Sequence, residues 1–291
     1  MEGPGAHDAP DLQTAIRRAS ARLAAAGVPS PRVDAELLAG HLLGVGRGRV
    51  AALALGGAPV PAGYDELVGE RCRRLPLQHL TGTAHFRHLE LSVGPGVFVP
   101  RPETEMLAQL AIDRARVVLA ATGHARIVDL GTGSGAIAAA VASEVPGTTV
   151  YAVERSPLAL AWAERNLAPH GVLLVSGDLR TALPEHDGAF DVVVSNPPYI
   201  PAGAVPNEPE AREHDPHEAL YGGGADGMDV PAAVVRSASR LLVPGGYAAM
   251  EHAEVQAQAV AGLFASAGCW TGVTGHRDLA GRDRATSATK L

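Results

Sequence analysis

The sequence is poor in cysteine, lysine and aromatic residues. It has two cysteines, Cys72 and Cys269, and an aromatic fraction of 4% in 291 residues. Thiols this far apart exclude a disulfide framework and a zinc site built on clustered cysteines, and they are typical of a reducing compartment. No uncharged apolar run reaches membrane-spanning length, and the N-terminus lacks the pattern of a signal peptide. We therefore expect a cytoplasmic protein with no membrane partner.

An excess of positive charge is also missing. The net charge is −7 at neutral pH, which argues against a protein whose main task is to grip nucleic-acid phosphates. Lys290 is the single lysine among 24 basic residues, a usage that we interpret as a genome-composition bias rather than a functional arginine cluster. The length suffices for one large α/β domain and one small domain.

The first third of the chain has helical patterns. After a tail at 1–8, which we expect to be disordered, helices are predicted over 12–26, from Ser30-Pro31 to Gly44, and over 62–75. This pattern predicts a small helical domain over 1–81.

A different pattern connects this domain to the rest of the chain. Apolar and polar residues alternate from 83 to 99, and Gly94-Pro95-Gly96 is typical of a turn, so a β-hairpin linker is expected over 82–100. A helix is predicted over 103–120.

Buried strands and helices then alternate over 101–291. Strands are predicted at 126–130, 149–153, 172–175, 190–194 and 246–250. Such alternation indicates an α/β fold with a doubly wound, mostly parallel sheet. Ligands bind such sheets at the carboxyl ends of the strands.

A glycine-rich loop follows the first of these strands. It comprises Gly131, Thr132, Gly133, Ser134 and Gly135. Its glycines allow a tight turn and a close approach to a ligand, and the following helix offers free N–H groups. Glu154, at the end of the next strand, can accept the two hydroxyls of a ribose. Alternatives are a nicotinamide-dependent oxidoreductase, a non-catalytic binder of S-adenosylmethionine and a purely structural turn.

The segment Asn196-Pro197-Pro198-Tyr199 closes the fourth strand at the same edge. The prolines remove two backbone donors, so the Asn196 side-chain oxygen and the Pro197 carbonyl can each accept one N–H of a planar –NH2 group. Tyr199 can stack on that group. Two acceptors orient a poorly nucleophilic amide nitrogen toward a methyl donor and favour its developing positive charge. Adenine presents an equally flat amino group, so adenine in a nucleic acid is the alternative substrate.

These residues resemble the amino-group methyltransferases with an Asp/Asn-Pro-Pro-Tyr/Phe signature. More closely, the chain resembles the release factor glutamine methyltransferase family, also called HemK or PrmC. The resemblance spans nearly the whole chain. The motifs that carry it, besides the two loops above, are Pro76 to Gly82, Val97 to Glu105 and Arg284-Ala285-Thr286.

The resemblance implies a class I, Rossmann-like methyltransferase fold that uses S-adenosyl-L-methionine. It implies that the substrate is the glutamine amide in the Gly-Gly-Gln motif of peptide-chain release factors, docked with help from the N-terminal helices. Residues 131–135 and Glu154 would hold the methyl donor, Asp178 and Leu179 would lie beside its adenine, and Asn196 would contact both donor and substrate. Residues 196–199 would bind the glutamine amide.

The chain departs from the family pattern at three places. Glu154 replaces the usual Asp, Leu179 replaces a frequent aromatic residue, and His214-Asp215-Pro216 replaces Phe-Glu-Pro. We expect the last two changes to affect adenine stacking and some substrate contacts.

Several further polar residues have competing interpretations. Arg101, Glu103 and Glu105 either close over the cofactor or simply begin a helix. His214 and His217 lack the companions of a metal site, and Glu251-His252 is expected to have a supporting or structural role.

Overall fold

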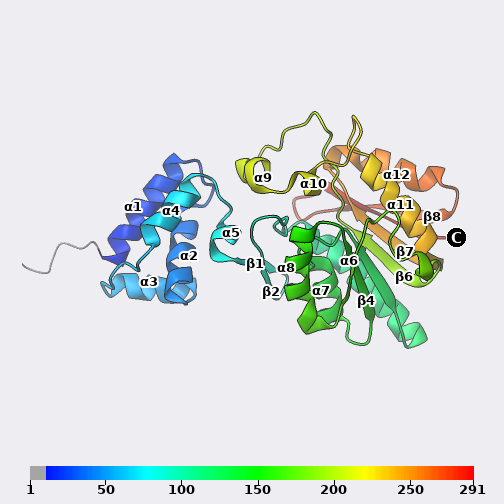
Figure 1. The fold of residues 1–291 in the computed structure, drawn as a ribbon, viewed down its shortest axis with the longest axis horizontal. Helices are drawn as coiled ribbons and strands as arrows, with labels where there is room; N and C mark the ends of the chain where they lie inside the picture. Colours follow the sequence, from blue (N-terminus) through cyan, green and yellow to red (C-terminus); the bar gives the residue numbers. More distant parts are fainter. Residues whose placement is uncertain (1–10) are drawn as a thin grey trace, which may run out of the picture. The chain divides into compact units, whose positions relative to one another are not determined.

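The computed structural model describes residues 11–291, so the tail expected at 1–8 lies outside the described residues. The chain forms two compact units (Figure 1). The first contains the residues up to Gly82 together with 207–214, and the second contains 83–206 and 215–291. The segment 207–214 therefore groups with the N-terminal helices, although it lies within the sequence range expected to form the methyltransferase domain.

The first unit is built from short helices around a small apolar core. The Asp11 side chain caps the first helix by accepting a hydrogen bond from the Thr14 N–H at 2.7 Å. The core includes Leu23, Leu38, Tyr64 and Val68. The helices are α1 (Leu12–Ala25), α2 (Pro31–Leu43), α3 (Arg47–Leu55), α4 (Tyr64–Cys72), α5 (Leu77–Thr81) and α9 (Pro209–His214).

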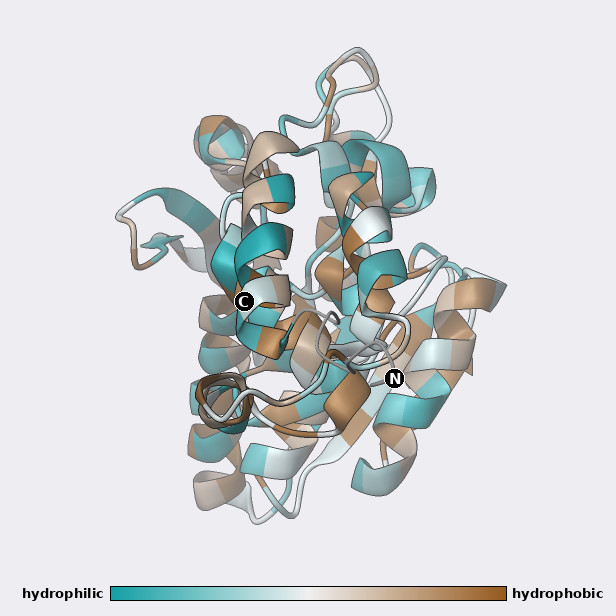
Figure 2. Ribbon diagram, turned by 90° about the vertical axis from the view of Figure 1, so that its left-hand side faces the viewer, coloured by the Kyte–Doolittle hydropathy of each residue, from teal (hydrophilic) through white to brown (hydrophobic). Residues whose placement is uncertain are grey.

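The first two predicted helices are confirmed. The third prediction, over 62–75, was too long, because α4 covers only 64–72. The separate helices α3 and α5 were not predicted. Most turns of the helices carry both hydrophobic and hydrophilic residues, as expected for helices with one face on a core (Figure 2).

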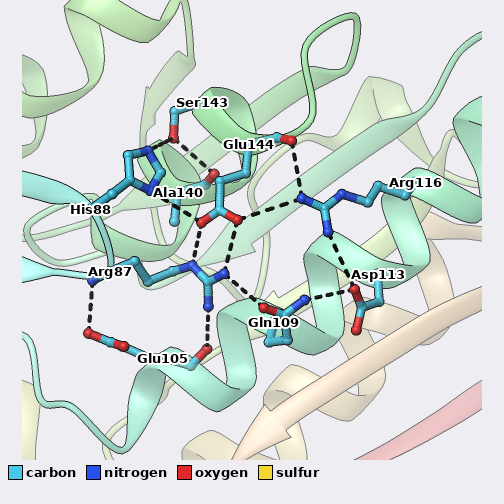
Figure 3. Close-up of polar contacts among 9 residues, drawn as sticks. All are labelled: Arg87, His88, Glu105, Gln109, Asp113, Arg116, Ala140, Ser143 and Glu144. Carbon is cyan, nitrogen blue, oxygen red and sulfur yellow. Dashed lines mark hydrogen bonds and ion pairs between the residues drawn. The ribbon is translucent and has the colours of Figure 1, made fainter.

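The second unit begins with the hairpin β1 (Thr83–Phe86) and β2 (Leu89–Ser92). The chain does turn at Gly94–Gly96, but the hairpin itself reverses at Arg87-His88, and Arg87 adopts a left-handed φ of 54°. Figure 3 shows how Arg87 compensates this strain. Its backbone N–H donates to Glu105 at 2.8 Å, and its guanidinium contacts Glu144 and Gln109.

The second unit is organised by one seven-stranded sheet with the order β5-β4-β3-β6-β7-β9-β8. The first five strands of that order run parallel, which confirms the predicted sheet, and β9 and β8 extend it antiparallel. These last two strands were not predicted. The strands are β3 (Arg126–Leu130), β4 (Thr149–Glu154), β5 (Leu173–Ser176), β6 (Phe190–Ser195), β7 (Leu242–Glu251), β8 (Trp270–Arg277) and β9 (Asp283–Lys290).

Helices cover both faces of this sheet (Figure 1). Alternate residues of β3 point to opposite faces, so Ile127 joins the core under α6, α7 and α8, and Val128 joins the core under α11 and α12. The helical segments of this unit are α6 (Thr104–Thr122), α7 (Ala136–Glu144), α8 (Pro157–Leu167), η1 (Ala168–His170), η2 (Pro184–His186), α10 (His217–Leu220), α11 (Asp229–Leu241), η3 (Glu254–Gln256) and α12 (Ala257–Ser266). Within residues 11–291, no helix combines the length and apolarity needed to cross a membrane.

Candidate active site

A cavity lies at the carboxyl ends of the central strands, entirely within the second unit. All but one of the residues predicted to bind cofactor or substrate line it: Gly131, Thr132, Gly133, Ser134, Glu154, Asp178, Leu179, Asn196, Pro197, Pro198 and Tyr199. The exception is Gly135. Residues that the sequence did not single out as ligands also line it, among them Phe98, Thr104 and Asp129.

Gly135 shapes the cavity wall without facing it. Its φ is 87°, and a Cβ atom there would lie 2.8 Å from the Leu167 side chain. Only glycine combines that backbone conformation with so close an approach of α8. The residue therefore sets where α7 begins, which in turn fixes the glycine loop.

Glu154 ties the glycine loop to the end of β4. Its Oε2 accepts from the Gly133 N–H at 2.9 Å, and its Oε1 accepts from the N–H groups of Arg155 and Ser156, each at 2.8 Å. A carboxylate has about four lone-pair directions, so these three bonds leave capacity for a further donor. That capacity fits the predicted role as acceptor of ribose hydroxyls.

Asp129, the fourth residue of β3, is a site residue that the sequence reasoning missed. It is 1% exposed, and its Oδ2 accepts from the Thr132 hydroxyl at 2.6 Å. Its Oδ1 makes no hydrogen bond of good geometry to the described residues, although the nearby Ala138 N–H at the start of α7 favours the ionised carboxylate. Burial raises the pKa of Asp129 to about 7. The sequence signal that could have identified Asp129 is its position, as an acidic residue shortly before the glycine loop.

Asp178 and Leu179 follow β5 and form another part of the wall. Burial acts to raise the pKa of Asp178, but hydrogen bonds and charge from Arg180, with the charge of Arg155, hold it below its ordinary value. The Ser237 hydroxyl donates to the Leu179 carbonyl at 2.8 Å. An anchored aliphatic side chain therefore occupies the place where the family often has an aromatic ring.

The loop Asn196–Tyr199 is held in place by hydrogen bonds from side chains to backbone carbonyl groups at its two ends. The Ser195 hydroxyl donates to the Leu130 carbonyl at 2.6 Å, which joins the ends of β6 and β3. The buried Gln256 donates to the Tyr199 carbonyl at 2.8 Å. A Cβ atom at Gly227 would lie 2.2 Å from that same carbonyl oxygen, so glycine is required there.

The side chain of Asn196 has a defined orientation. Its Nδ2 donates to the Thr104 hydroxyl at 3.2 Å. The donor end of the amide is thus occupied, which leaves Oδ1 as the atom that can accept from a ligand. Burial raises the pKa of Tyr199, so its ring remains a neutral phenol beside Asn196.

The charged residues before α6 support the wall of the cavity. Arg101 pairs with Asp215 at 2.8 Å and lies over the Phe98 ring, with 5.0 Å from its guanidinium carbon to the ring centroid. Glu103 pairs with Arg282 at 3.5 Å. Asp215, in the segment that departs from the family pattern, thus has a structural partner.

Two further questions concern the side chains that could hold a metal ion and the role of His252. Residues 11–291 contain no cluster of three or more His, Cys, Asp or Glu side chains that could hold a metal ion. His252 is fully buried, with Nε2 2.9 Å from the Thr286 hydroxyl and Nδ1 2.9 Å from the Ala253 carbonyl. Burial lowers its pKa, so it is a structural histidine.

Comparison with known proteins identifies the family. The model of the PrmC N-terminal domain matches residues 14–82, and that of the methyltransferase small domain matches 103–208. A release factor glutamine methyltransferase of Streptomyces coelicolor is 49% identical over 280 residues, which are 96% of this chain and 98% of that protein. The chain belongs to the release factor glutamine methyltransferase family. It is an S-adenosylmethionine-dependent methyltransferase, and the nicotinamide alternative for the glycine loop is rejected.

Two further comparisons concern a relative named for a different substrate and a solved structure with a similar fold. The 4-amino-L-phenylalanine/4-methylamino-L-phenylalanine methyltransferase of Streptomyces pristinaespiralis is 39% identical over 266 residues, which are 90% of each chain. A methyltransferase structure from Pyrococcus furiosus has a TM-score of 0.51 at 20% identity, and it covers 70% of this chain and 89% of that one. The latter likeness confirms the methyltransferase fold.

The cavity has the donors and acceptors that a nucleoside methyl donor requires. Glu154 has spare acceptor capacity, the glycine loop leaves room for close approach, and the Asp129 carboxylate has one oxygen without a partner within residues 11–291. An unpartnered buried carboxylate oxygen is costly unless a donor meets it, and the ammonium group of S-adenosylmethionine is such a donor. The residues present therefore fit this group.

Proposed function

We propose that this protein methylates the side-chain amide nitrogen of the glutamine in the Gly-Gly-Gln motif of peptide-chain release factors. The observation that carries the proposal is the orientation of Asn196. Its amide nitrogen is bonded to Thr104, so its oxygen remains for a substrate N–H. Pro197, which has no N–H, contributes a second carbonyl acceptor in the same cavity wall.

The residues of the loop address the weak nucleophilicity of an amide. When bound, S-adenosylmethionine supplies an electrophilic methyl group on a sulfonium. Asn196 and Pro197 would each accept one N–H of the substrate and so fix the direction of its nitrogen. Their oxygens also favour the positive charge that develops there. Tyr199 would stack on the flat amide and keep water away from it.

The relative from Streptomyces pristinaespiralis supports a second candidate substrate. Its name describes methylation of an amino group on an aromatic ring, and it is 39% identical to this chain. An arylamine is also planar and delocalised, so the same two acceptors suit it. The higher identity to a release factor glutamine methyltransferase favours glutamine. The same relatives favour glutamine over the adenine alternative.

Parallel methylation assays with three candidate substrates test the proposal. The enzyme and labelled S-adenosylmethionine are incubated separately with a release factor, with 4-amino-L-phenylalanine and with duplex DNA. Mass spectrometry of the Gly-Gly-Gln peptide should show one added methyl group on glutamine. Labelling of the amino acid or the DNA without labelling of the release factor would contradict the proposal. In Asn196→Ala, turnover should fall by about 100-fold or more.

The proposed substrate also bears on docking, on localisation and on nucleic-acid binding. We propose that the helices of residues 1–81, which match the PrmC N-terminal domain over 14–82, help to dock the release factor. Because the proposed substrate works at the ribosome, we also propose that the enzyme is cytoplasmic. We propose no stable binding of nucleic acid, consistent with the net charge of −7.

A further inference from the structure

A buried carboxylate lies next to Asn196 at the end of the neighbouring strand. In the parallel pairing of β6 and β7, Ser195 is opposite Met250. The next residues, Asn196 and Glu251, therefore leave the sheet side by side. Glu251 is 3% exposed and does not line the cavity, whereas Asn196 does.

Thr104 connects these two residues. It is the first residue of α6, is 4% exposed, and its hydroxyl accepts from Asn196 Nδ2 at 3.2 Å. The Thr104 hydroxyl and the Asn196 amide also stabilise the ionised Glu251 carboxylate by hydrogen bonding. Glu251 Oε2 has no hydrogen-bond partner among the described residues. The Glu251 carboxylate and the cavity-lining Thr104 and Asn196 thus form one hydrogen-bonded network.

The chemistry of the three groups determines which of them donates and which accepts each hydrogen bond, and this order is the direction of the network. An ionised carboxylate only accepts hydrogen bonds, whereas a hydroxyl both donates and accepts, and an amide has one end of each kind. If Glu251 accepts from Thr104, the hydroxyl oxygen is left to accept from Asn196. The asparagine must then present its NH2 end to the network and its oxygen to the cavity.

We propose that Glu251 is the positioning residue that, through Thr104, holds Asn196 with its side-chain oxygen toward the methyl acceptor. The proposal rests on the function proposed above, because that function requires Asn196 Oδ1 as the acceptor of a substrate N–H. The negative charge also polarises the Asn196 amide, which makes Oδ1 a stronger acceptor while positive charge develops on the substrate nitrogen.

The charged and titratable neighbours of Glu251 come from several elements. Arg284 on β9 favours its ionised form, and Glu103 before α6 disfavours it. Arg284 is shared with Asp278, which lies 3.3 Å away. Tyr199 stays protonated, and His252 is bonded to Thr286 instead. Burial raises the pKa of Glu251 to about 7, so the network gains its direction as the pH rises through neutrality.

One experiment observes the network directly, without turnover. The chain has three asparagines, Asn166, Asn196 and Asn207, so selective 15N labelling gives three side-chain amide pairs, and Asn196→Asp assigns the relevant one. We expect the Asn196 amide resonances to titrate near pH 7 in the wild type and to lose that titration in Glu251→Gln. Resonances that do not titrate, or titrate equally in Glu251→Gln, would overturn the proposal.

Kinetics test the consequence for catalysis. In Glu251→Gln we expect kcat to fall on the order of tenfold, because a misdirected acceptor no longer orients the nucleophile, and its rise with pH near 7 to disappear. The KM for S-adenosylmethionine should stay within about twofold. Thr104→Ser, which keeps the hydroxyl, should retain most activity, and Thr104→Val should resemble Glu251→Gln.

The controls separate positioning from folding and from the choice of substrate. Glu254→Gln, an exposed residue three positions along the chain, should match the wild type in rate and pH profile. Equal losses in Thr104→Ser and Thr104→Val would overturn the positioning role. A wild type that leaves the release factor unmethylated but shows the Asn196 titration would reject the proposed substrate and retain the network.

Discussion

The strongest stability prediction concerns Glu210, which holds segment 207–214 to the N-terminal helices. One carboxylate oxygen accepts from Arg71 Nη1 and Arg74 Nε, each at 2.8 Å. Arg71 is 5% exposed and also pairs with Asp34 at 2.7 Å. We expect Glu210→Gln to destabilise the first unit, because it removes the charge that compensates two arginines, one of them buried.

The size of the effect follows from the pKa of Glu210. Hydrogen bonds from the two arginines outweigh burial and lower it from 4.5 to about 2. A difference of about 2.5 pH units corresponds to about 3–4 kcal/mol at neutral pH. Partial exposure and the remaining acceptor of glutamine reduce this to about 1–2 kcal/mol. Since the folded pKa is depressed, the stabilisation is complete above about pH 5 and is lost as the pH falls toward 2.

Urea unfolding combined with hydrogen exchange measures this effect in each unit. Peptides covering 12–81 should lose protection by about 1–2 kcal/mol in Glu210→Gln, and peptides from the sheet should not. Glu213→Gln is the matched control, because Glu213 is in the same helix but pairs only with the exposed Arg212 in the described structure. Equal shifts in the two variants, or a difference that does not shrink as the pH falls from about 5 toward about 2, would refute the reasoning.

Three further predictions concern the second unit. Arg87→Ala should lower the free energy of unfolding by about 2–3 kcal/mol. Arg87→Gly should be about 1 kcal/mol less harmful, because glycine tolerates the φ of 54°. Gly135→Ala should cost roughly 1–3 kcal/mol more than Gly171→Ala by thermal unfolding, because a Cβ at Gly135 meets Leu167 whereas one at Gly171 meets nothing within 4 Å. Binding of S-adenosylmethionine at pH 7 should release a fraction of a proton, since a cationic ligand favours ionised Asp129. Calorimetry in buffers of different ionisation enthalpy should show this release in the wild type and not in Asp129→Asn.

The sequence was sufficient for the features that local patterns encode. The parallel strands were predictable because each contains a short apolar run, and most of them are followed by a loop and a helix. The candidate site was predictable because its residues follow the carboxyl ends of those strands. By contrast, β8 is exposed over most of its length, so its residues lack the alternation that predicts a strand. Helix α3 begins at Arg47-Gly48-Arg49 without a side-chain cap.

Contacts between distant segments could not be predicted. Glu210 meets arginines 136 and 139 positions away in the sequence, and no local pattern shows that 207–214 belongs with the N-terminal helices. The link between Asn196 and Glu251 depends on the register of β6 and β7. Asp129 was visible in the sequence, but its unpartnered oxygen exists only after the fold buries it.

The course of the chain between the two units leads to a last prediction. From Tyr199 the chain passes through residues 207–214, which belong to the first unit, and returns at Asp215, which pairs with Arg101. Arg101 in turn lies over the ring of Phe98, a residue that lines the cavity. Loss of the Glu210 ion pairs should therefore make the chain on both sides of segment 207–214 more mobile. We expect this to weaken the binding of a protein substrate more than the binding of the methyl donor. In Glu210→Gln we expect a severalfold higher KM for the release factor and an unchanged Kd for S-adenosylmethionine by calorimetry. An equal loss of affinity for the release factor and for S-adenosylmethionine would mean that segment 207–214 merely stabilises the cavity.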